Sequence, residues 1–198
     1  MLAYNIFLGG VGGQGIGLLC EILLRAADHA GLAAKAVDTH GLAQRGGTVV
    51  SHIRLGEAVF SPLIGDGEAH LVAALERHEA MRGLRTALRD GGDLVYYDAS
   101  LQPLGVRLGR EDEVTAADID RLAGPRGIRV HRVKERVLPD PRMQNMLVLA
   151  EILGHGIIPG IGAGHVLQAM EDLLAGAALA ANVRLFHEQA GLDGAGNG

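Results

Sequence analysis

The chain has almost no cysteine, the residue that iron–sulfur clusters and thiolate metal sites require. It contains one cysteine, Cys20, among 198 residues, which excludes an intramolecular disulfide and any iron–sulfur cluster or thiolate zinc site held by this chain alone. The first residues, MLAYNIF, also lack the basic region and cleavage site of a secretory signal. We therefore expect a cytoplasmic protein that binds no metal and no cofactor by itself.

Aromatic residues and clustered basic residues are also scarce. Aromatics make up 3% of the chain and the net charge is -5, with the 18 basic residues scattered, which predicts no nucleic-acid partner because such binding needs a basic surface and stacking platforms. No apolar run reaches the ~20 residues of a membrane span, so we expect no membrane partner. The 30 glycines and 48% hydrophobic residues instead predict one globular domain with a core of small and branched aliphatic side chains.

The hydrophobic pattern predicts alternating strands and helices. A strand at residues 5–8, a glycine turn, a helix over 17–31 and a strand at 33–37 read as a βαβ unit. Further strands are expected at residues 48–54, 69–74, 94–97 and 128–133, and further helices at 77–89, 116–122, 143–153, 166–174 and 177–190. The sequence DGGD at 90–93 is expected to be a turn, and residues 191–198 a disordered tail. This order predicts an α/β fold.

The glycine turn GVGGQG at residues 10–15 satisfies G-x-G-x-x-G through Gly10, Gly12 and Gly15. Such a turn can direct backbone amides at an anion. Asp38 follows at about the spacing, roughly 20 residues, expected of a ribose-binding acid. One hypothesis is therefore a stand-alone Rossmann-type NAD(P)-dependent oxidoreductase or a dinucleotide-sensing module; the alternative is that the glycines only make a tight turn.

A second polar segment, HGLAQRGG at residues 40–47, follows the second predicted strand, where ligands of α/β sheets bind. Arg45 suits a phosphate or carboxylate, and Gly46 and Gly47 permit close backbone contact. His40 is the residue type whose charge can change near neutral pH. The alternatives are that Arg45 clamps backbone carbonyls or a partner chain, and that His40 is a hydrogen-bonded loop residue.

Other catalytic patterns fail. The sequence Gly65-Asp66-Gly67 matches the start of a thiamin diphosphate and magnesium signature, but residues 90–97, where it should end, contain no asparagine. The stretch DGEAH at 66–70 has alternating metal-ligand types, although acidic turns before strands are common. We therefore expect no thiamin or metal site, and assign no catalytic residue.

Several motifs in order resemble a known family. They are GVGGQG at 10–15, HGLAQRGGTV at 40–49, SHIR at 51–54, SPLI at 61–64 and the segment 76–82. This series, spread over residues 5–189, resembles the gamma subunits and gamma domains of 2-oxoacid:ferredoxin oxidoreductases, including those acting on pyruvate. The QRGG and SPLI forms are most similar to the small (beta) subunit of the indolepyruvate branch.

The resemblance implies a single-domain three-layer α/β/α sandwich of Rossmann-like type, with a mostly parallel or mixed sheet, in which residues 1–190 form a gamma-type catalytic domain. It implies an enzyme subunit, inactive alone, of a complex that converts an aryl 2-oxoacid to its acyl-CoA and reduces ferredoxin. Thiamin diphosphate, Mg and [4Fe-4S] clusters would lie on a large partner subunit, and coenzyme A would be a co-substrate.

The residues expected to contact coenzyme A or the partner are Gly10, Gly12, Gly13, Gln14, Gly15, His40, Gln44, Arg45, Gly46, Gly47 and Asn145. A subunit that serves assembly alone, with no ligand contact, is the remaining alternative.

Overall fold

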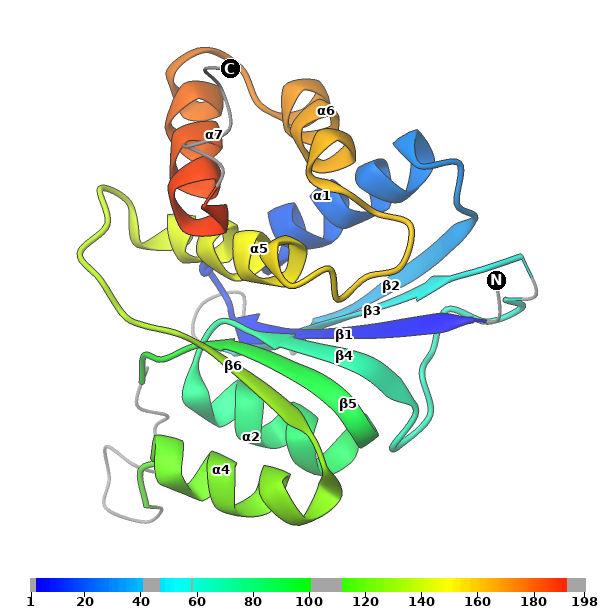
Figure 1. Cartoon of the computed structure of the whole chain (residues 1–198), viewed down its shortest axis with the longest axis vertical. Helices are drawn as coiled ribbons and strands as arrows, with labels where there is room; N and C mark the ends of the chain where they lie inside the picture. The colour runs from blue at the N-terminus through cyan, green and yellow to red at the C-terminus, as the bar shows by residue number, and fades with distance from the viewer. Residues whose placement is uncertain (1–2, 41–46, 58, 101–111, 192–198) are drawn as a thin grey trace.

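A six-stranded sheet with helices on both faces forms the protein, as a computed structural model shows for residues 3–40, 47–57, 59–100 and 112–191 (Figure 1). The strands are β1 (Tyr4–Val11), β2 (Ala34–His40), β3 (Thr48–Leu55), β4 (Ala69–Ala74), β5 (Leu88–Tyr97) and β6 (Arg129–Val133). Their spatial order is β2-β3-β1-β4-β5-β6. The predicted α/β class is confirmed.

The sheet is mixed, because β3 runs against its neighbours. β1, β4, β5 and β6 pair in parallel, whereas β3 pairs antiparallel with both β1 and β2. The expected βαβ unit is therefore split: β3 lies between β1 and β2. Periodicity could not show this, because it gives no information about which strands are neighbours.

Helices α1 (Ile16–His29) and α5 (Gln144–Gly154) lie directly on one face of the sheet. Helices α2 (Arg77–Thr86) and α4 (Ala116–Ala123) cover the other face (Figure 1). Two short 3-10 helices, η1 (Gly124–Arg126) and η2 (Pro141–Met143), follow α4 and precede α5. The expected sandwich of helices around a sheet is present.

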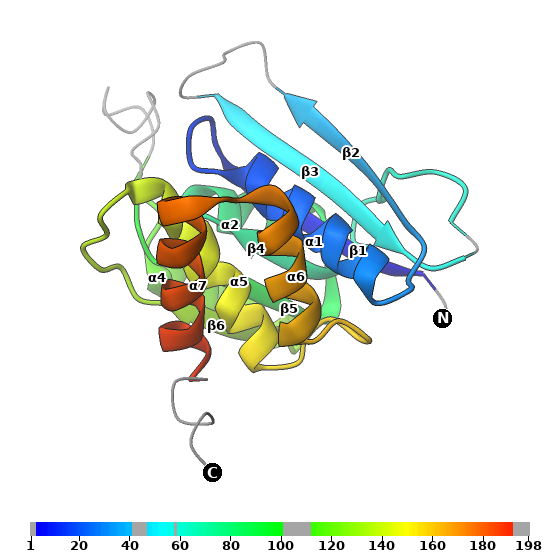
Figure 2. The ribbon, with the colours of Figure 1, turned by 90° about the horizontal axis from the view of Figure 1, so that it is seen from above.

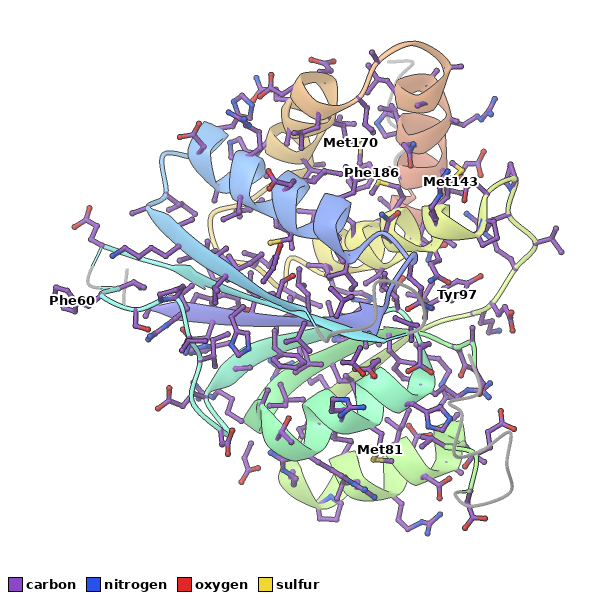
Figure 3. All side chains as sticks on the ribbon, turned by 180° about the vertical axis from the view of Figure 1, so that it is seen from behind. Phe60, Met81, Tyr97, Met143, Met170 and Phe186 are labelled. Carbon is purple, nitrogen blue, oxygen red and sulfur yellow. The ribbon has the colours of Figure 1, made fainter. Side chains whose placement is uncertain are left out.

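A second tier of helices covers the first on the α1 and α5 side. Helix α6 (Ala163–Leu173) packs on α1, and α7 (Gly176–Ala190) packs on α5 (Figure 2). Phe186 and Met170, both fully buried, join these helices to the core (Figure 3). Helix α5 therefore lies between the sheet and α7.

The prediction at residues 77–93 is wrong in one respect. Helix α2 ends at Thr86, and β5 already begins at Leu88 and runs through the DGGD sequence that was expected to be a turn. The register between β4 and β5 shifts here, and Gly91 has φ 70. A Cβ on Gly92 would lie 3.0 Å from the His70 carbonyl oxygen. The two glycines therefore form a bulge inside a strand, which has the same composition as a turn.

Two further expectations concern the chain outside these elements. No helix in the ranges given above is long and apolar enough to cross a membrane. The tail expected at 191–198 lies, beyond Gly191, outside the described residues.

Gly83 allows α2 to lie close to the sheet. A Cβ there would lie 2.6 Å from Val72 Cγ1 and 3.3 Å from Phe7 Cε1. We expect Gly83→Ala to lower the unfolding free energy by about 1 kcal/mol or more in urea denaturation, because overpacking outweighs the better helix propensity of alanine. Gly164→Ala, at an exposed position of α6 where a Cβ meets nothing within 4 Å, is the control and should lose no stability. Equal midpoints for the two variants would contradict close packing at Gly83.

Candidate functional site

The side chain of Gln14 closes the glycine turn between β1 and α1. It is 6% exposed, and its Oε1 accepts a hydrogen bond of 2.7 Å from the Val11 N–H. Its Nε2 donates to the Leu75 carbonyl at 3.2 Å. Because Leu75 directly follows β4 and its own N–H donates to the Gly9 carbonyl, the turn is fixed to the end of β4.

Two glycines of the turn are required by packing rather than by a ligand. A Cβ on Gly10 would lie 2.7 Å from Ile16 Cγ1, and a Cβ on Gly15 would lie 2.6 Å from Asn145 Nδ2. Gly15 also has φ 88, in the left-handed region that favours glycine. Asn145 Nδ2 donates to the Gly15 carbonyl at 3.0 Å. The turn is therefore held by α1 from one side and by α5 from another.

The backbone amides of the turn are largely used within the chain. The Val11 N–H donates to Gln14, the Gly12 N–H donates to the Gly47 carbonyl at 2.9 Å, and the Gln14 N–H donates to the Val11 carbonyl at 3.0 Å. A phosphate site at a helix N-terminus needs such N–H groups to point at the ligand. These three N–H groups point elsewhere.

Asp38 is also badly placed to hold a ribose beside the turn. β3 separates β2 from β1, so the two strands lie about 10 Å apart instead of about 5 Å. Burial is the main cause, and the nearby Asp38 carboxylate the second, of the rise in the pKa of the Cys20 thiol to about 12. Asp38 thus acts on the α1 side of the sheet, and the dinucleotide alternative loses its geometric basis.

A cleft of about 420 Å³ opens at the carboxyl ends of the parallel strands. Three segments form it: the turn after β1, the residues at the end of β5 and beyond, and the connection from β6 to α5. Its lining consists of Gly12, Gly13, Gln14, Tyr97, Ala99, Ser100, Glu135, Arg136, Leu138, Pro141, Arg142 and Gln144. Tyr97 marks this end of the sheet in Figure 3, and the 93% exposed Phe60 lies at the opposite end.

Tyr97 fixes the far wall of the cleft. Its hydroxyl, on a side chain that is almost fully buried, donates to the Arg136 carbonyl at 3.1 Å and accepts from the Arg136 N–H at 3.0 Å. The backbone of Arg136 is thereby held while its side chain stays exposed. A fixed backbone with an exposed guanidinium suits the binding of an anion.

The other polar groups of the cleft differ in availability. Arg142 is paired with Asp140, with 2.5 Å between Nη2 and Oδ2, and these hydrogen bonds raise the pKa of the Arg142 guanidinium. The Arg136 guanidinium makes no ion pair with any residue in the part of the chain that the structure describes. Ser100 Oγ is buried and has no hydrogen-bond partner among those same residues. Arg136 is therefore the charged group of the cleft most available to a ligand, whereas the Ser100 hydroxyl is unpartnered but buried.

The predicted site residues divide into three groups. Gly12, Gly13 and Gln14 line the cleft, and Gly47 is joined to Gly12. Gly10, Gly15 and Asn145 pack behind the turn: Asn145 is 1% exposed, and its neighbour Gln144 is the residue of α5 that lines the cleft. Gln44, Arg45, Gly46 and the side chain of His40 lie outside the described residues.

Sequence reasoning missed Tyr97, Ser100, Arg136 and Arg142. Tyr97 ends the predicted strand at 94–97, and the others follow predicted strands. This position could have indicated a site, because the carboxyl ends of parallel strands meet at one edge of the sheet. The stretch at 66–70 gathers no metal-ligand group: Glu68 Oε2 accepts from the Gly65 N–H, and His70 Nδ1 accepts from the Asn5 N–H. Three potential metal ligands do meet elsewhere, at His131, Glu151 and His155.

The fold and cleft define an α/β domain whose ligand crevice is built from strand ends. The family described as "Pyruvate ferredoxin/flavodoxin oxidoreductase" matches residues 5–191, and the chain belongs to this family.

Individual relatives agree with this assignment. Indolepyruvate oxidoreductase subunit IorB of Archaeoglobus fulgidus is 32% identical over 86% of this chain and 85% of its own length. The subunit of the same name from Methanothermobacter thermautotrophicus is 29% identical over 93% of this chain and 95% of its own length.

Solved structures share the fold. The gamma subunit of keto/oxoacid ferredoxin oxidoreductase from Geobacter sulfurreducens has a TM-score of 0.65 at 17% identity, covering 94% of this chain and 95% of that one. The 2-oxoglutarate:ferredoxin oxidoreductase from Magnetococcus marinus, solved with 2-oxoglutarate, coenzyme A and succinyl-CoA bound, has a TM-score of 0.68 at 18% identity. It matches 98% of this chain, which spans 32% of that longer one.

Removing the Gln14 side chain tests its role in the turn. Gln14→Ala leaves the half-buried Val11 N–H and the buried Leu75 carbonyl without their partner, so we expect the unfolding free energy to fall by about 1–3 kcal/mol. Gln168→Ala, at an exposed position of α6, is the control and should change it by less than about 0.5 kcal/mol. Urea denaturation measures both. If Gln14→Ala matched the control, the turn would not depend on this side chain.

Proposed function

We propose that the chain is the small, non-thiamin-binding subunit of an indolepyruvate:ferredoxin oxidoreductase. The complex would oxidatively decarboxylate an aryl 2-oxoacid to its acyl-CoA and carbon dioxide, and would pass the two electrons to ferredoxin. The family match over residues 5–191 carries this proposal. The similarity to two IorB subunits over most of the chain favours the indolepyruvate branch.

The residues of this chain do not fit the redox cofactors of such a complex. The single cysteine, Cys20, is buried, and burial raises the pKa of its thiol to about 12, whereas a [4Fe-4S] cluster needs several thiolates in one place. The asparagine of the thiamin signature is also missing. We therefore assign thiamin diphosphate, Mg and the clusters to a large partner subunit, and ferredoxin contact to the assembled complex. The single cysteine also supports a cytoplasmic location.

The cleft at the carboxyl ends of the strands is the part of this chain that we assign to coenzyme A and to the partner. Its volume of about 420 Å³ suits part of coenzyme A rather than the whole molecule, so a partner surface would complete the site. Arg136 provides the available cation in a lining that also includes Ser100. The Magnetococcus marinus enzyme, which shares this fold, was solved with coenzyme A bound, and this supports the choice of ligand.

The segment 40–47 contributes to the same proposal. The Gly47 carbonyl accepts a hydrogen bond from the Gly12 N–H, so the last residue of the segment lies beside the glycine turn. Gln44 and Arg45 are assigned to an anionic group of coenzyme A or to the large subunit, with Gly46 permitting close approach. Which of the two they contact is decided by separate assays of assembly and acyl transfer.

Co-purification tests the subunit assignment. The chain, produced together with a candidate large subunit or captured from its native cells, is expected to purify in a larger brown complex. That complex should reduce ferredoxin in a reaction that requires coenzyme A and is faster with indolepyruvate than with pyruvate. The isolated chain should show no thermal shift with NADH or NADPH, because a ligand bound by the folded state alone must stabilise it. A chain that purifies alone and is stabilised by either dinucleotide would overturn the assignment.

Arginine substitutions test the cleft. Arg136→Ala in the assembled complex should raise the KM for coenzyme A by about tenfold or more, because a charge-assisted hydrogen bond contributes about 1.5–3 kcal/mol, and should leave assembly intact. Arg45→Ala should impair either assembly or acyl-CoA formation. Arg121→Ala, which removes an exposed guanidinium on α4, is the control. An unchanged KM for Arg136→Ala, or an Arg45→Ala complex that is normal in both assays, would remove that residue from the site.

A further inference from the structure

The end of α5 that lies away from the cleft carries a cluster of side chains that the proposed function does not use. His131 lies on β6, Glu151 lies in the last turns of α5, and His155 directly follows that helix. One ligand atom from each lies within 4.8 Å of the other two. Along the helix axis, Glu151 lies about 10 Å and His155 about 16 Å from Gln144 at the cleft.

Secondary structure accounts for the meeting of these three residues. Glu151 and His155 are four residues apart and share one face of the helical turn. α5 packs on β5 and β6, and His131 lies on the same face of β6 as the buried Val133, which belongs to the core beneath α5. The imidazole rings of His131 and His155 are consequently 4.5 Å apart between centroids.

Neighbouring polar groups orient two of the three side chains. His131 Nε2 lies 3.1 Å from Asp93 Oδ1, and Asp93 is fixed by Arg129 through bonds of 2.8 and 2.6 Å. A hydrogen on Nε2 leaves the lone pair of Nδ1 for a ligand. Gln189 on α7 donates to Glu151 Oε2 at 3.0 Å, which leaves Oε1 on the side of His155. Outer partners of this kind are typical of metal-bound histidine and carboxylate groups.

We propose that His131, Glu151 and His155 bind one divalent cation of the zinc type. Two imidazoles and one carboxylate are ligands that Zn²⁺ accepts, whereas Ca²⁺ and Mg²⁺ prefer oxygen alone. The fourth position faces solvent, because the side chain of His155 is 52% exposed.

The present separation of the ligand atoms is compatible with binding. Zinc bonds of about 2.0–2.2 Å place tetrahedral ligand atoms about 3.4 Å apart. His155 Nε2 and Glu151 Oε1 already lie 3.1 Å apart, and no separation in the cluster exceeds 4.8 Å, so only the approach to His131 has to shorten, by about an ångström. The exposed His155, at the end of α5, can supply this movement by rotation of its side chain. The cation then joins the end of α5 to the edge strand β6, which is independent of the proposed oxidoreductase function.

Metal titration of the full 198-residue chain tests the site. After removal of metal with EDTA, calorimetry with ZnCl₂ should show one ion per chain, and the melting temperature should rise with zinc. Co²⁺ in place of zinc should give the strong visible absorption of a four-coordinate ion. His155→Ala and Glu151→Gln should each weaken zinc binding by more than about tenfold. Loss of an outer hydrogen-bond partner already costs about tenfold or more, and these two residues are direct ligands.

A second histidine and carboxylate pair provides the matched control. His29 Nε2 lies 2.9 Å from Asp172 Oδ2, and its side chain is 29% exposed, but it belongs to no cluster of three ligands among the described residues. His29→Ala should therefore keep the zinc affinity of the unaltered chain. The proposal is overturned if the unaltered chain takes up no zinc, or if His155→Ala and Glu151→Gln bind it as tightly as His29→Ala does.

Discussion

The cleft depends on the buried amide of Gln14, which joins the Val11 N–H to the Leu75 carbonyl. Each hydrogen bond contributes about 1 kcal/mol net to stability, but a buried group left without its partner costs about 1–3 kcal/mol. Loss of the amide would therefore destabilise the conformation of the turn. Asn145 adds a third bond, to the Gly15 carbonyl. β1, β4 and α5 are thus held at one point, and the cleft is built around it.

This arrangement changes the meaning of the glycine motif. The spacing of Gly10, Gly12 and Gly15 is that of a dinucleotide-binding turn, yet Gly10 and Gly15 are required because Ile16 and Asn145 occupy the space of a side chain. The intervening strand β3 also moves Asp38 away from the turn. What the turn offers to a ligand is its outer surface, together with Tyr97, Ser100 and Arg136, which supports a shared site with a partner more than a self-contained nucleotide site.

The local sequence pattern was sufficient to predict most helices and strands, but not which of them lie next to one another. The strand at 69–74 was predicted with its observed bounds and the helix at 143–153 to within a residue at each end. The first is a short, mostly apolar run, and the second is bounded by Asp140-Pro141 before it and Gly154 at its end. Gly91 and Gly92 misled, since a bulge and a turn need the same freedom of the backbone. Tyr97 and Arg136 came together only through the strand order. His131, likewise, is distant in sequence from Glu151 and His155, and only the packing of α5 on β6 unites them.

Hydrogen–deuterium exchange of the chain, alone and in complex with its large subunit, tests the central claim that the carboxyl edge of the sheet faces the partner. We expect protection on assembly to concentrate at residues 12–14, 97–100 and 135–142, the segments that line the cleft, and NADH to protect none of them. Protection confined to α6 and α7, or protection of residues 12–14 by NADH in the isolated chain, would contradict it.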